Sequence, residues 1–224
     1  MAAKITPKDL QEPDKLQLLF LAARTFVEKH RSRIVIGAGL FVLLVILSGG
    51  WYIYQLQYER TAEKIYSRVF ESMMKEFATS ELETIKGYKD LIAQFPRSHA
   101  ALSAHYRLGN LYLNRREIDA ATKAYEDFLR KVPKNSDLQT LALNGLGTAY
   151  EFAMDYKQAL KYYEKALETS AAPSFEAMNY NNLGRTYEAL NNYPKAVEYY
   201  SKAHDKTIDP LMKLYLKRRV AQLS

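Results

Sequence analysis

The chain of 224 residues contains no cysteine. That absence excludes disulfide bonds, thiolate metal sites and cysteine nucleophiles, and it is compatible with an oxidising or a reducing compartment. The chain has only four histidines, and they show neither an HExxH motif nor any other metal-ligand spacing: His30, His99, His105 and His204. The sequence therefore predicts no metal site.

Nucleotide-binding and catalytic motifs are missing as well. No GxxxxGK(S/T) loop occurs, and Gly37-Ala38-Gly39 is not a dinucleotide fingerprint, because it lies inside an apolar run with no third glycine. The many carboxylates fall at the solvent positions of amphipathic helices. We therefore predict a protein that is not an enzyme and needs no cofactor, with an undetected catalytic activity as one alternative class.

Positive charge is not concentrated anywhere in the chain. The net charge of +7 divides into +3 for residues 1–33 and +4 for residues 55–224, where basic and acidic residues are mixed. A nucleic-acid binder needs a concentrated basic face. The composition thus argues against nucleic acid as a partner.

One long run has no charged side chain. Residues 34–54, IVIGAGLFVLLVILSGGWYIY, form a stretch of 21 residues that would span about 30 Å as a helix, the thickness of a bilayer's hydrocarbon core. Arg31 and Arg33 precede the run, and Trp51, Tyr52 and Tyr54 end it. Such flanks are typical of membrane interfaces. The run predicts a single transmembrane helix; the alternative is a helix buried in a protein core.

The arm before this run gives the orientation. Five Lys or Arg residues lie in the 19 positions before the run, against three in a comparable stretch after it: Lys15, Arg24, Lys29, Arg31, Arg33, and Arg60, Lys64, Arg68. The positive-inside rule then keeps the arm in the cytoplasm and sends the large domain across the membrane. We expect no cleaved signal peptide, because 33 residues precede the run.

The arm itself is amphipathic. Its apolar residues recur at three- and four-residue steps and share one helix face: Leu16, Leu19, Phe20, Ala23, Phe26 and Val27. A helix of this kind could lie in the headgroup plane, or it could extend the spanning helix into the cytosol. The sequence leaves both arrangements open.

The domain after the run contains three similar segments, which begin at His105, Leu143 and Tyr180. Each has Leu-Gly, then Tyr, Ala, Tyr, and finally Ala or Phe, at the same spacings. The matched sets are Leu108, Gly109, Tyr112, Ala121, Tyr125, Phe128; Leu146, Gly147, Tyr150, Ala159, Tyr163, Ala166; and Leu183, Gly184, Tyr187, Ala196, Tyr200, Ala203. These spacings place each set on the facing stripes of two helices.

A glycine within a helix costs about 1 kcal/mol relative to alanine, so each of these glycines needs a packing reason. We expect the missing side chain to let the second helix of each pair approach closely. The small residues facing the glycines would then be Ala121, Ala159 and Ala196.

These residues resemble the tetratricopeptide repeat (TPR) over roughly residues 99–210. The resemblance implies an all-α solenoid of helix pairs. One departure concerns the first signature position, often tryptophan in the family, which is His105, Leu143 and Tyr180 here.

The segments flanking the repeats complete the expected organisation. Ser80 and Glu83 form a capping box at the start of the second helix of a degenerate repeat, which precedes the three repeats that are numbered first to third below. Asp209-Pro210 starts a closing helix, with Leu211, Leu214, Tyr215 and Leu216 toward the repeats and Lys213, Lys217, Arg218 and Arg219 toward water. The expected parts are a cytoplasmic arm, a transmembrane helix, a stalk with the degenerate repeat, three TPR units and a capping helix: residues 1–33, 34–54, 55–98, 99–208 and 209–224.

In the TPR family a concave groove is lined by positions of the first helices. Here the resemblance gives Tyr106, Asn110, Asn114, Asn144, Thr148, Phe152, Asn181, Arg185 and Glu188. Amides, an arginine and aromatic rings suit an extended or helical peptide; the alternative for each residue is a solvated helix face. The family's basic carboxylate clamp does not carry over, because it needs lysines where this chain has Tyr106 and Asn144.

The layout of the whole chain resembles the bacterial YfgM-like family of ancillary Sec-translocon subunits. This resemblance implies an inner-membrane protein with a cytoplasmic N-terminus and a periplasmic repeat domain. It would be a scaffold or chaperone-network partner that meets translocon components, periplasmic chaperones or emerging exported chains, and would contact lipid through residues 34–54. The alternative is an envelope-assembly adaptor for an outer-membrane or cell-wall complex.

Overall fold

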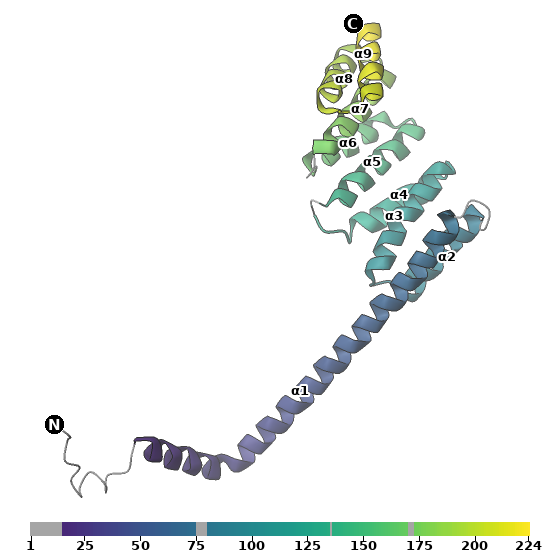
Figure 1. Ribbon diagram of the computed structural model, residues 1–224. Helices are drawn as coiled ribbons and strands as arrows, with labels where there is room; N and C mark the ends of the chain where they lie inside the picture. Colours follow the sequence, from purple (N-terminus) through teal and green to yellow (C-terminus); the bar gives the residue numbers. More distant parts are fainter. Residues whose placement is uncertain (1–14, 75–79, 135, 170–172) are drawn as a thin grey trace, which may run out of the picture. The chain divides into compact units, whose positions relative to one another are not determined.

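The structure, a computed structural model, describes residues 15–74, 80–134, 136–169 and 173–224 (Figure 1). All regular structure in these ranges is α-helical, so the predicted all-α class is confirmed. The helices are α1 (Lys15–Met74), α2 (Glu81–Gln94), α3 (His99–Asn114), α4 (Ile118–Leu129), α5 (Asp137–Phe152), α6 (Tyr156–Glu168), α7 (Pro173–Ala189), α8 (Tyr193–Lys206) and α9 (Pro210–Leu223). The parts of the expected arm and stalk that fall on residues 1–14 and 75–79 lie outside the described residues.

The chain divides into two compact units, Met1–Gln57 and Tyr58–Ser224. The described part of the first unit is the N-terminal portion of α1, a long apolar helix in which no residue from Gln17 to Gln57 is buried. A kink interrupts this helix at His30, whose backbone is non-helical with φ −114° and ψ 17°. Two helical segments therefore meet at His30: the first carries the amphipathic arm, and the second carries the apolar run of residues 34–54.

The second unit is an array of helix pairs. The helices α3 and α4, α5 and α6, and α7 and α8 pack as pairs, and each pair packs on the next, with α2 at one end and α9 at the other. Residues 58–74 of α1 lie beside α2, where a Cβ on Gly87 would come within 2.8 Å of Val69 Cγ2. This stacking of helix pairs is the TPR-like array that the sequence predicts.

Tyrosine rings fill the places left by the repeat glycines. A Cβ on Gly109, Gly147 or Gly184 would come within 2.5, 2.3 or 2.7 Å of the ring of Tyr125, Tyr163 or Tyr200. The expected close approach is thus present, but a buried tyrosine ring occupies the space rather than Ala121, Ala159 or Ala196. The ring of Tyr125 also lies against the next repeat, 2.4 Å from a Cβ on Gly145. Each glycine is required because no other residue leaves room for a ring at helix–helix distance.

The helix pairs share one turn geometry. Arg116, Met154 and Asn191 occupy the same place in the three turns and have φ values of 61°, 59° and 57°. In each turn the following amide donates to the carbonyl of the tyrosine five residues earlier, as Asp155 N does to Tyr150 O at 2.9 Å. This left-handed residue ends each first helix and sets the direction of the second.

The predicted helix starts are confirmed: Ser80 and Glu83 form a capping box, and Asp209 caps α9 ahead of Pro210. The predicted inward face of α9 is correct for the fully buried Leu216 and for Tyr215, whose ring lies edge-on to that of Tyr200 with centroids 6.5 Å apart. It is wrong for Leu211 and Leu214, which are 77% and 49% exposed. The helix packs against the cluster around Tyr187 and Tyr200 through residues that are three or four positions apart: Met212, Leu216, Val220 and Leu223. That spacing keeps one face against the repeats over the full length of α9.

His105 is buried, 8% exposed, at the first signature position of its repeat. Its Nε2 has no hydrogen-bond partner among the residues that the structure describes. Burial, together with the nearby charges of Lys131 and Arg130, lowers the pKa of the imidazole from 6.5 to about 4. The folded repeat therefore holds His105 neutral at pH values where the unfolded chain binds a proton.

We expect the free energy of unfolding of the repeat domain to fall by about 2 kcal/mol between pH 7 and pH 5, because the lowered pKa makes the unfolded chain the better proton acceptor. The stability is present above the unfolded pKa and is lost as the pH falls toward the folded pKa. Urea unfolding at both pH values measures it. His105→Leu, which copies Leu143 of the next repeat, should remove this part of the pH dependence; an unchanged pH slope in that variant contradicts the assignment.

Candidate functional site

The nine predicted groove residues lie on the first helices α3, α5 and α7. Asn114, Phe152 and Arg185 are exposed, and five others are half-buried: Tyr106, Asn110, Thr148, Asn181 and Glu188. Asn144 differs, because it is only 6% exposed. The structure thus places eight of the nine where a partner could touch at least part of the side chain.

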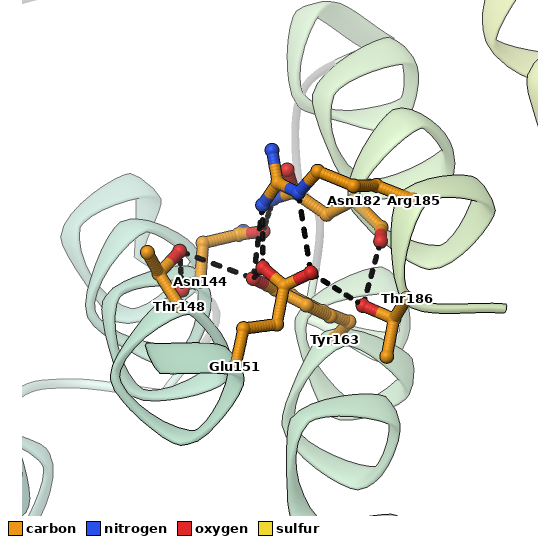
Figure 2. Close-up of polar contacts among 7 residues, drawn as sticks. All are labelled: Asn144, Thr148, Glu151, Tyr163, Asn182, Arg185 and Thr186. Atoms are coloured by element: carbon orange, nitrogen blue, oxygen red, sulfur yellow. Dashed lines mark hydrogen bonds and ion pairs between the residues drawn. The ribbon is translucent and has the colours of Figure 1, made fainter. Parts of the chain in front are cut away.

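Glu151, which is not among the predicted groove residues, joins two repeats through its carboxylate (Figure 2). Its Oε2 accepts the phenol hydrogen of Tyr163 at 2.6 Å. Arg185 of α7 binds both oxygens, through Nε at 3.1 Å and Nη2 at 2.5 Å, and Thr186 Oγ1 donates at 2.9 Å. The Glu151 side chain is 10% exposed and that of Arg185 is 45% exposed. We call these four residues, Glu151, Tyr163, Arg185 and Thr186, the Glu151 cluster.

A buried amide network lies beside the Glu151 cluster and explains the burial of Asn144 (Figure 2). Asn144 Nδ2 donates to Asn179 Oδ1 at 2.6 Å and to the carbonyl of Thr140 at 2.9 Å. Asn144 Oδ1 accepts from Asn182 Nδ2 at 2.8 Å. Because buried amides need partners, Asn144 holds α5 to α7, and the prediction that it faces a bound partner is not supported by its position.

The arrangement of tyrosine, glutamate and arginine recurs one repeat later. Tyr200 donates its phenol hydrogen to Glu188 Oε2 at 2.8 Å, and Arg219 of α9 forms an ion pair with Glu188. The expectation that Arg219 points to water is therefore wrong, since Glu188 draws it toward the repeats. In the first repeat, Tyr125 donates to Asn110 Oδ1 at 2.7 Å instead. Polar contacts of this kind thus occur along the array of first helices, from α3 to α7, and reach the closing helix α9.

The alignment of the repeats could have identified Glu151. It stands four residues after Gly147, as Glu188 stands four after Gly184. The predicted groove residues include Glu188 but, in the preceding repeat, Phe152 in place of its neighbour Glu151. What the alignment lacked was the pairing of Glu151 with Arg185, 34 residues away.

Burial shifts the pKa values of the phenols at these sites upward. Burial raises the pKa of the Tyr163 phenol, and the charge of Glu151 raises it further. Burial also raises the pKa values of Tyr125 and Tyr200. These phenols remain protonated donors at neutral pH. Within the described ranges, no group of three or more His, Asp or Glu side chains is placed to hold a metal ion.

The accessible groups around the Glu151 cluster and around Glu188 are aromatic and charged. A hollow of about 460 Å³ is lined by Arg185, Glu188, Ala189, Tyr200, Tyr215 and Arg219. Next to the Glu151 cluster, the guanidinium carbon of Arg116 lies 3.5 Å from the centre of the Phe152 ring, which is 40% exposed. This surface therefore presents hydrogen-bonding groups and aromatic rings.

Two family models match the sequence, both described as tetratricopeptide repeat, over residues 103–135 and 138–206. A search of curated proteins gives no match. Among solved structures, the fold is similar to the nearly identical TPR-like repeats of a kinesin light chain-type protein from Podosopora anserina, with a TM-score of 0.58 and 14% identity over 74% of this chain and 86% of that chain. A single-substitution form of that protein gives a TM-score of 0.59 and 13% identity over the same shares. Such identities establish the fold alone. TPR repeats suggest a protein-binding scaffold, a class that is typically non-catalytic.

Proposed function

We propose that this tetratricopeptide-repeat protein is a membrane-anchored scaffold whose repeats bind other proteins. The observation that carries the proposal is the row of accessible polar and aromatic side chains along α3, α5 and α7. The contact residues are Tyr106, Asn110, Asn114, Thr148, Phe152, Asn181, Arg185 and Glu188. Peptide segments bind such helical grooves through side-chain contacts, without a cofactor.

The anchor in this proposal is the apolar part of α1. Its unburied apolar surface supports a transmembrane helix over residues 34–54. The excess of basic residues before residue 34 supports a cytoplasmic N-terminus, which places the repeats on the opposite side of the membrane. The kink at His30 supports an arm that leaves the axis of the spanning helix and lies in the headgroup plane.

The finer assignment is an ancillary subunit of the bacterial Sec translocon, with the repeats in the periplasm. It is supported by the layout of the chain, in which an amphipathic arm, a span and a repeat domain follow one another as in the YfgM-like family. The partners would be translocon components, periplasmic chaperones or emerging exported chains. The second candidate, with the same architecture, is an envelope-assembly adaptor for an outer-membrane or cell-wall complex.

Extraction in several mild detergents, followed by mass spectrometry of the co-purifying proteins, tests this assignment. We expect Sec components to co-purify, and their absence in every detergent would contradict the translocon role. The combined variant Asn114→Ala and Phe152→Ala should reduce capture at least fivefold, because both side chains are exposed on the proposed contact face. Leu82→Ala, which removes an exposed apolar side chain from α2, is the matched control. Equal capture by both variants would exclude the proposed face.

A further inference from the structure

Two of the three repeats contain a stacked pair of tyrosines. Tyr150 stacks on Tyr162 with ring centroids 5.3 Å apart and an angle of 5° between the planes. Tyr187 stacks on Tyr199 at 5.4 Å and 7°. The second ring of each pair comes 15 residues after the repeat glycine, Gly147 or Gly184. Such pairs contribute about 0.5–1.5 kcal/mol beyond the area they bury.

The first repeat lacks the second ring. Tyr112 stands where Tyr150 and Tyr187 stand, but the residue 15 positions after Gly109 is Ala124. A hollow of about 400 Å³ lies at this place between α2, α3 and α4. Its apolar lining includes Tyr112, Ala124, Ala120, Ala93, Ile92 and Leu108. We call this space the Tyr112 hollow.

The charge beside the ring position also changes in the first repeat. Glu126 lines the same hollow as Tyr162, and its charge adds to burial and to Tyr150 in raising the pKa of the Tyr162 phenol. Glu164 acts in the same direction on Tyr199. Lys89 occupies the position in the degenerate repeat that Glu126 and Glu164 occupy in the two repeats that follow it. A cation, Lys89, thus replaces an anion beside the ring position at which Ala124 stands in place of a tyrosine.

Lys89 lines the hollow from α2. Its Nζ lies 5.5 Å from the centre of the Tyr112 ring, and the lysine is exposed on α2. A flexible lysine stem can swing aside while its ammonium group stays in water. Lys123 and Asp127 also line the hollow, so its charged lining consists of two cations and one anion.

We infer that the Tyr112 hollow receives an aromatic side chain from a partner protein, in a segment where acidic residues flank the aromatic one. The incoming ring would lie on Tyr112 as Tyr162 lies on Tyr150, and the flanking carboxylates would meet Lys89 and Lys123. This surface is formed by α2–α4 and does not include the Glu151 cluster. The inference therefore holds or fails independently of the proposed contact face and of the translocon assignment.

The full chain in lipid nanodiscs, with labelled alanine and isoleucine methyl groups, can be titrated with capped pentapeptides and followed by NMR. We expect Gly-Glu-Phe-Glu-Gly to shift the methyl signals of Ala93, Ala120 and Ile92 with a Kd on the order of 1 mM, as suits a single anchoring ring. Gly-Glu-Leu-Glu-Gly should bind about fivefold more weakly, because it cannot stack. Gly-Gln-Phe-Gln-Gly should bind about threefold more weakly, because it lacks the charges.

Two variants probe the hollow itself. Ala124→Tyr supplies the missing ring from within the chain, as Tyr162 and Tyr199 do, and should weaken binding of the Glu-Phe-Glu peptide at least tenfold. Lys89→Glu restores the charge found at Glu126 and Glu164, and it should make the Gln-Phe-Gln peptide the tighter ligand. If Ala124→Tyr does not fold, the reversal in Lys89→Glu decides. Equal binding of the phenylalanine and leucine peptides, no shifts at 10 mM, or unreversed preference in Lys89→Glu would overturn the inference.

Discussion

Replacing Gly147 with alanine is expected to lower the free energy of unfolding of the repeat domain by about 3 kcal/mol, at the upper end for overpacked cores. The added Cβ would lie 2.3 Å from Cε1 and 2.6 Å from Cδ1 of Tyr163. The ring is fully buried, and its phenol is bonded to Glu151, so it cannot withdraw without breaking that contact. Helix propensity alone predicts the opposite sign, a gain of about 1 kcal/mol. Urea unfolding of the full chain, followed by circular dichroism, measures the difference.

A double-mutant cycle identifies the cause of that loss. In a Tyr163→Leu background the ring is absent, and the additional effect of Gly147→Ala should fall to below about 1 kcal/mol. If Gly147→Ala has the same effect in both backgrounds, contact with Tyr163 is not the reason for the glycine.

Truncating Glu151 to alanine is expected to destabilise the domain by about 3 kcal/mol, within the range for removing one partner of a buried polar cluster. The change leaves the buried Tyr163 phenol without its carboxylate acceptor and takes both oxygens away from Arg185. The expected loss in the free energy of unfolding lies at the lower limit for buried ion pairs, because the Arg185 side chain is 45% exposed and water can solvate it. Glu151→Gln keeps an oxygen acceptor for the phenol and should lose about half as much.

Glu198→Ala is the matched control for the Glu151 variant. Its carboxylate pairs with Lys202 four residues on, with 54% of the Glu198 side chain exposed. Exposed pairs of this kind contribute little to stability, because water and salt screen the two charges. Equal losses in Glu151→Ala and Glu198→Ala would mean that the Glu151 cluster does not hold repeats two and three together.

The apolar side of the repeats could be predicted from the sequence in detail. Leu108, Leu146 and Leu183 are buried as their spacing requires, because a 3.6-residue period fixes which side chains share a helix face. The same local reasoning found the caps at Ser80 and Asp209. The same reasoning was wrong for part of α9. It placed Leu211 and Leu214 toward the repeats, but the helix face that contains Leu216 packs against the last repeat.

The polar side of the repeats could be predicted only in part. Alignment placed Arg185 and Glu188 on the first helices, but it could not tell a side chain that meets a partner from one that holds the next repeat. Asn144 illustrates the difference, since its amide bonds reach Asn179 and Asn182, 35 and 38 residues away. Such pairings depend on how far each repeat is displaced and rotated against its neighbour, which no local spacing encodes.

The sequence by itself determined that this chain is a helical array with TPR repeats and a long apolar N-terminal helix, because helix periodicity, capping and hydropathy are local properties of the chain. The tertiary structure decided which polar groups meet, Glu151 with Arg185 and Glu188 with Arg219, and it showed the hollow beside Tyr112 and Ala124. Those outcomes depend on stacking between repeats, where rotation of a helix about its axis exchanges an exposed side chain for a buried one.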